Sequence, residues 1–92
     1  MRINSITAKF VQSIPIELEE GILYISDKYR TATHLCACGC KGKTVTPLGI
    51  DGWIMTNADG VITLRPSIGN WAGEVPYHAH YHITNNTIEW LD

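Results

Sequence analysis

The chain has 92 residues, a length that predicts a single domain over residues 1–92. Its net charge is −2 and only 17% of its residues are charged, so we do not expect the basic surface of a nucleic-acid-binding protein. No stretch approaches the roughly 20 apolar residues that cross a membrane, and the N-terminus lacks the apolar core of a signal peptide. The three cysteines are spaced two apart and make poor disulfide partners, so we expect a protein of the reducing cytoplasm. Together with the charge and the absence of a long apolar stretch, this predicts no membrane or nucleic-acid partner.

The elements predicted along the chain are short strands. Most show alternation of apolar and polar residues or are rich in β-branched and aromatic residues, and none has a sustained helical period. The Asp59-Gly60 pair is typical of a tight hairpin turn, and the segment 65–76, rich in glycine and proline, is predicted to be a packed loop. The predicted strands are residues 6–12, 22–26, 31–36, 43–48, 53–56, 61–64, 77–83 and 87–91. The fold class is therefore mainly β, a small antiparallel roll or sandwich of hairpins.

All the cysteines lie within five residues, at Cys36, Cys38 and Cys40, and His34 precedes them by two positions. Alternate side chains of a strand share one face, and a turn at Gly39 would bring the last thiol back toward the others. Thiolates this close repel one another unless they are protonated or bind a cation, for which zinc is the commonest choice. The competing interpretation is that the cysteines are small buried apolar residues. The clustering favours a structural zinc site that staples the hairpins together.

Tetrahedral zinc needs a fourth ligand, and the strand 77–83 offers three histidines on one face, His78, His80 and His82. We expect one of them to complete the site, although His34 is also a candidate. A histidine that does not bind the metal is able to act as a base near neutral pH. Which of the four residues binds the metal stays open at this point.

A nucleophile is proposed at Ser67, in the predicted loop 65–76, with one of the histidines of strand 77–83 as its base. The backbone N–H groups of Gly69 and Asn70 would face the oxyanion that develops on the substrate. A catalytic pair requires hydrogen-bonding distance between hydroxyl and imidazole, which sequence does not give. The alternative is a turn serine that makes a local backbone hydrogen bond.

Several of these segments together resemble a family of small bacterial proteins long catalogued as a domain of unknown function. The resemblance is carried by residues 31–40, 66–71, 80–83 and 88–90 and covers nearly the whole chain. It implies a metal-binding, peptidase-like component of a bacterial ubiquitin-like conjugation system, which processes or removes the modifier. The implied partners are the ubiquitin-like protein, its conjugates and the associated conjugation enzymes.

The resemblance also implies a ligand set for zinc, with one departure. It makes metal ligands of Cys36, Cys38 and Cys40. Family members usually carry a further cysteine three residues before the histidine that matches His80, and this chain has Tyr77 there. Because a phenol binds zinc poorly at neutral pH, the adjacent His78 is the expected substitute.

The same resemblance strengthens the predictions for the catalytic residues. It implies Ser67 and His80 as the reacting pair and His34 as a ligand or active-site neighbour, so all three are predicted catalytic residues. The leading hypothesis is a zinc-stabilised peptidase. The alternatives are a non-catalytic zinc-binding adaptor that docks a ubiquitin-like protein or its enzymes, and a metallohydrolase whose zinc carries water.

Overall fold

The computed structural model describes residues 2–72 and 75–91, with side chains for residues 2–69 and 79–91. Eight strands make up the regular structure. They are β1 (Thr7–Phe10), β2 (Ile22–Ser26), β3 (Thr31–Leu35), β4 (Lys43–Pro47), β5 (Ile54–Ala58), β6 (Val61–Ala72), β7 (Val75–Thr84) and β8 (Thr87–Trp90). No helix within the described ranges is suited by length and apolar character to cross a membrane. The mainly β class predicted from the sequence is confirmed.

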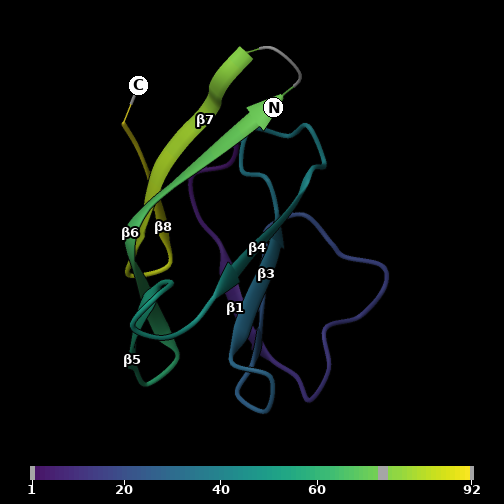
Figure 1. The fold of residues 1–92 in the computed structure, drawn as a ribbon, viewed down its shortest axis with the longest axis vertical. Coiled ribbons are helices and arrows are strands. Elements are labelled where there is room, and N and C mark those ends of the chain that lie inside the picture. The colour runs from purple at the N-terminus through teal and green to yellow at the C-terminus, as the bar shows by residue number, and fades with distance from the viewer. Residues whose placement is uncertain (1, 73–74, 92) are drawn as a thin grey trace.

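The strands form two four-stranded sheets, ordered β1-β2-β3-β4 and β5-β6-β7-β8 (Figure 1). Every named pair is antiparallel except β1 and β2, which are parallel. The parallel pair departs from the predicted run of hairpins. It arises because the connection over residues 11–21 carries the chain back to the start of β1 before β2 begins.

Two isolated bridges join the sheets into a roll. One is antiparallel, between Ser5 and Thr87, and the other is parallel, between Leu48 and Trp53. The inner faces of both sheets supply one core of buried apolar side chains. Its members are Ile6, Leu23, Ile25, Ala32, Cys36, Ala37, Ile62, Leu64, Ile68, Ala79, Tyr81, Ile83 and Ile88. The tip of the β3–β4 hairpin therefore reaches the same core as the central strands of the second sheet.

The seam beside Trp53 depends on a glycine. A Cβ added at Gly52 would lie 2.2 Å from the carbonyl oxygen of Pro47. This is a steric clash with the backbone, so the backbone would have to move to accept a side chain. We expect Gly52→Ala to lower the free energy of unfolding by about 2 kcal/mol or more. Gly60→Ala is the control, because nothing lies within 4 Å of a Cβ added there. Only the φ of +88° at Gly60 disfavours a side chain, so we expect this substitution to lower the free energy of unfolding by about 1–2 kcal/mol. Urea unfolding would contradict this account if Gly52→Ala proved no more destabilising than Gly60→Ala.

The predicted loop over residues 65–76 is wrong, because β6 continues to Ala72 and β7 begins at Val75. The register explains how a strand contains these residues. Leu64 pairs with Ile83 and Ile68 pairs with Tyr81, so residues 65–67 of β6 stand opposite the single residue between those partners. A bulge of this kind accommodates a proline, which has no N–H for the ladder, and turns nearby side chains in new directions.

Candidate functional site

The bulge brings Ser67 to His80. The Oγ atom of Ser67 lies 2.9 Å from Nε2 of His80, a hydrogen-bonding distance, and both side chains are partly exposed. The two residues belong to the paired strands β6 and β7, in which Gly69 stands directly opposite His80. A hydroxyl and an imidazole so placed have the geometry of a nucleophile and its general base.

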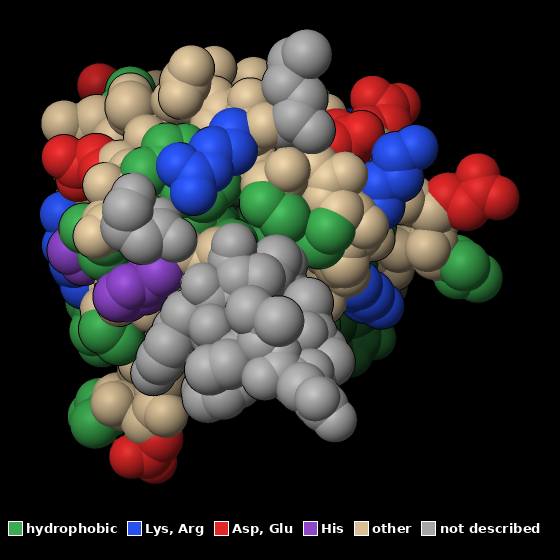
Figure 2. Space-filling view, turned by 90° about the horizontal axis from the view of Figure 1, so that it is seen from above, with side chains coloured by type: hydrophobic (Ala, Val, Ile, Leu, Met, Phe, Trp, Pro, Cys, Tyr) green, Lys and Arg blue, Asp and Glu red, His purple; other side chains and the backbone are tan. Residues whose placement is uncertain are grey.

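The faces of β7 differ sharply in burial. Ala79, Tyr81 and Ile83 are completely buried, whereas His80 and His82 are partly exposed. Figure 2 looks onto the end of the molecule where β6 and β7 project, and histidine side chains reach the surface there. The Ser67–His80 pair therefore lies on the outer face of the second sheet, where a macromolecular substrate is able to approach it.

The backbone beside this pair has an open edge. β5 begins at Ile54, whose partner is Arg65, so no strand in the described part of the chain covers β6 beyond Arg65 on that side. The carbonyl of His80 accepts a hydrogen bond from Leu91 N–H at 3.0 Å, so the backbone polar groups of His80 point away from β6. In an antiparallel ladder its partner Gly69 then directs its own N–H and C=O away from β7.

This geometry separates the two backbone donors predicted for the oxyanion. Gly69 points its N–H to the open edge, two residues from Ser67, whereas the next residue, Asn70, points its N–H toward β7 and pairs with Ala79. Gly69 is therefore the donor that a bound substrate is able to reach.

The three cysteines come together at the tip of the β3–β4 hairpin. Their Sγ atoms all lie within 4.8 Å of one another, and those of Cys36 and Cys38 are 3.3 Å apart. Cys36 is buried, Cys38 is partly buried and Cys40 is exposed. Positive φ angles at Gly39 (92°) and Lys41 (63°) turn the tip back on itself, as the sequence predicted for Gly39.

His34 lies behind β7. It is completely buried, and its Nε2 is 2.7 Å from the hydroxyl of Tyr81. Burial lowers the pKa of His34 to about 4, so the imidazole is neutral at physiological pH. Tyr81 belongs to the inner face of β7, and His80 belongs to the outer face. His34 therefore does not contact the Ser67–His80 pair, in contrast to its prediction as an active-site neighbour.

A family model described as "bacterial ubiquitination-like system serine protease (BubE)" matches residues 10–91, which include Ser67, His80 and all three cysteines. The chain belongs to this family. No curated protein and no solved structure matches it at a significant level. Membership confirms the resemblance found in the sequence and supports a peptidase-like role in a bacterial ubiquitin-like pathway.

Within this family member, the thiol cluster is able to hold a metal ion. Four ligands at the usual Zn–S distance of about 2.3 Å are about 3.8 Å apart in a tetrahedron, close to the separations of the three sulfurs. No fourth histidine, cysteine, aspartate or glutamate joins the group among the side chains that the structure describes. The side chains of His78 and Tyr77 lie outside that part, so the prediction of His78 as the fourth ligand stays a prediction.

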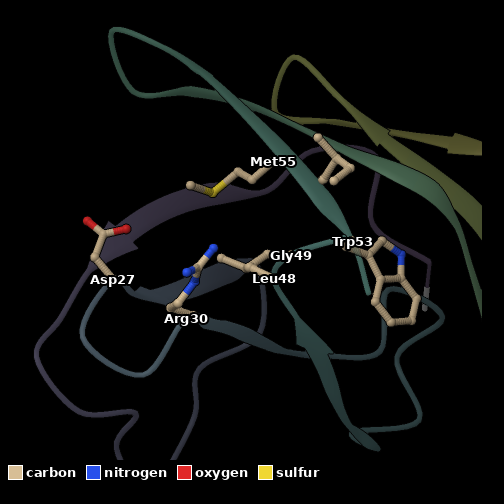
Figure 3. Close-up of a pocket in the computed structure, with 7 residues that line it drawn as sticks. Asp27, Arg30, Leu48, Gly49, Trp53 and Met55 are labelled. Atoms are coloured by element: carbon tan, nitrogen blue, oxygen red, sulfur yellow. The ribbon is translucent and has the colours of Figure 1, made fainter. Parts of the chain in front are cut away.

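A pocket of about 460 Å³ opens elsewhere, between the β2–β3 turn and the start of β5 (Figure 3). Its lining residues are Asp27, Arg30, Leu48, Gly49, Trp53, Ile54 and Met55. It includes neither member of the Ser67–His80 pair and none of the cysteines. The pocket is therefore separate from the Ser67–His80 pair and from the thiol cluster.

Sequence reasoning missed one residue of interest. Tyr81 was assigned only to the apolar face of its strand, but its hydroxyl contacts both His34 and the thiol hairpin. The available signal was chemical, because a tyrosine on a fully buried face requires a hydrogen-bonding partner for its hydroxyl.

Proposed function

We propose that this chain is a serine peptidase that processes or removes a ubiquitin-like modifier, with Ser67 as nucleophile and His80 as general base. The observation that supports it is the 2.9 Å separation of Ser67 Oγ and His80 Nε2, on an accessible face, in a chain whose family is described as a serine protease. The proposal accounts for both residues with one reaction, acyl transfer to a hydroxyl.

The reaction proceeds in two halves. Ser67 Oγ attacks the scissile carbonyl carbon while His80 Nε2 accepts the hydroxyl proton, and His80 then donates that proton to the departing amine. This leaves the acyl group on Ser67. Water next attacks the acyl-enzyme while His80 accepts its proton, and His80 returns that proton to Ser67 Oγ as the ester bond breaks and the acid product leaves. In the neutral imidazole that starts each half, the proton is on Nδ1 and Nε2 has a free lone pair.

The substrate would bind as an extended chain along the open edge of β6. Backbone pairing with Gly69 would fix the strand next to Ser67, in the manner of strand addition to an exposed sheet edge. A folded modifier is able to offer such a strand only through a flexible terminal tail. We therefore infer that the scissile bond follows the C-terminal tail of the ubiquitin-like protein.

The proposed metal is zinc, held by Cys36, Cys38 and Cys40 with His78 as the fourth ligand. When bound by three thiolates and an imidazole, zinc supplies a closed cross-link without an open position for water. The chain's own contribution is to place the hairpin tip against β7, where Ala37 N–H lies 3.4 Å from the Tyr81 hydroxyl. The metal is proposed to stabilise the site rather than to react.

The test is release of a reporter domain fused to the C-terminus of a ubiquitin-like protein from a bacterial ubiquitination-like system. We expect one break, at the last residue of the modifier, located by intact-mass measurement of both products. A matched fusion whose tail is shortened by several residues should resist cleavage, because the extended segment would no longer reach the β6 edge. Binding of the modifier without any release would instead favour the non-catalytic adaptor.

A further inference from the structure

Tyr81 lies on β7, the strand that carries His80, and its hydroxyl contacts residues of β3 and of the thiol hairpin. It is completely buried, and burial raises the pKa of its hydroxyl above the usual range. The hydroxyl lies 2.7 Å from His34 Nε2 and 3.4 Å from Ala37 N, and Cys36 next to Ala37 contributes, after burial, to raising the pKa of the hydroxyl. All three residues belong to β3 or to the hairpin tip that follows it.

The proton positions in this group are mutually consistent. As a phenol, Tyr81 has one proton to donate, and a cysteine binds a metal as a thiolate, which accepts a hydrogen bond and has no proton of its own. The phenol oxygen then accepts from His34 Nε2–H and from Ala37 N–H. Neutral His34 with its proton on Nε2 fits this arrangement and leaves Nδ1 as an unprotonated atom, which has no hydrogen-bond partner among the described residues.

The backbone of Tyr81 connects the same residue to the catalytic pair. His80 precedes it on β7, and its cross-strand partner on β6 is Ile68, which follows Ser67. Ile68 is 1% exposed and Tyr81 is completely buried, so both side chains are tightly packed in the core. A shift of either one would move its strand, and with it the neighbouring Ser67 or His80 on the outer face. An edge-to-face contact with Trp90, at 5.1 Å between ring centroids, further fixes the ring.

We propose that Tyr81 is a positioning residue that couples the metal-binding thiols to the Ser67–His80 pair. On the inner face of β7, the hydroxyl of Tyr81 orients Cys36 of the hairpin tip as a metal ligand. On the outer face, the backbone of Tyr81 fixes the distance between Ser67 and His80. Partners that hydrogen-bond to metal ligands typically affect metal affinity or activity about 10–100-fold. The proposal rests on the proposed function for its catalytic half and on the thiol cluster alone for its metal half.

The test compares Tyr81→Phe with Tyr24→Phe. Tyr24 is also buried, and its hydroxyl accepts a hydrogen bond at 3.1 Å from Glu19 N, which belongs to the connection before β2 and not to the thiol hairpin or the catalytic pair. Cobalt(II) and zinc affinities are measured by competition with a chelator, and kcat and KM are measured on the fusion substrate. We expect Tyr81→Phe to bind both metals about 10-fold or more weakly and to lose kcat with little change in KM. Tyr24→Phe should change neither affinity nor kcat.

A folded Tyr81→Phe variant that binds metal and turns over substrate like Tyr24→Phe would overturn the proposal. Should Tyr81→Phe not fold, His34→Leu and His34→Gln replace it, because they act on the same hydroxyl from its partner. Only the glutamine amide is able to donate to Tyr81, so the glutamine variant should retain metal affinity that the leucine variant loses, and equal affinities in both would reject the coupling. Absence of cleavage by the wild type and by Tyr24→Phe would defeat the proposed function, while the metal affinities would still decide the role of Tyr81 at the thiols.

Discussion

Replacing Ser67 with alanine is expected to reduce cleavage of the fusion substrate about 10³-fold or more while leaving the fold and the metal content unchanged. The hydroxyl is the atom that forms the acyl-enzyme, and removing one member of a nucleophile–base pair eliminates most of the rate that the pair provides. The cost to stability is small, on the order of 1 kcal/mol, because the partly exposed hydroxyl contributes one hydrogen bond. Single-turnover kinetics and metal analysis on the same sample measure both effects.

His80→Gln should cleave the substrate at a similarly reduced rate. The double variant with Ser67→Ala should be little slower than either single variant, because the rate losses of residues that act as one unit are strongly non-additive. The exposed Ser13 provides a matched control, and Ser13→Ala should cleave like the wild type. Cleavage that persists in Ser67→Ala would remove the serine from the mechanism and revive the metallohydrolase alternative.

Loss of the proposed zinc ion is expected to have the second largest effect. Apparent binding free energies of structural zinc sites are about 10–16 kcal/mol, and much of this is folding free energy. Chelation should therefore unfold the chain or lower its melting temperature steeply, and Cys36→Ser should do the same because Cys36 also belongs to the buried core. Loss of activity and loss of fold should then coincide.

The chelator experiment is followed by circular dichroism and by cleavage in parallel. Cys40→Ser is the milder comparison, because that thiol is exposed and is not part of the buried core. A closed structural site requires the two signals to fall together. Activity that disappears while the circular dichroism is unchanged would show that the ion takes part in the reaction.

The parts of the site that sequence predicted correctly are those determined by local spacing. Cys36, Cys38 and Cys40 are close because one hairpin tip carries all three, and the glycine turn needed to gather them is visible in the sequence. The alternation of buried and partly exposed residues along β7 also follows from the strand period alone. Neither inference required knowledge of how the sheets pack.

What sequence could not provide depends on pairing between distant strands. The glycines and the proline of residues 65–76 suggested a loop, because the bulge that accommodates Pro66 exists only in register with β7. The same bulge sets the distance between Ser67 and His80. The contact of His34 with Tyr81 joins residues 47 positions apart, and its burial removed His34 from the place predicted for it.

The most direct test of the Ser67–His80 mechanism is covalent labelling of the active protein with a fluorophosphonate, followed by peptide mapping. The predicted result is a single adduct on Ser67, formed at the same rate as cleavage activity is lost and absent from His80→Gln. An unlabelled Ser67 in protein that still cleaves its substrate, or an adduct on another residue that accounts for the lost activity, would contradict the mechanism.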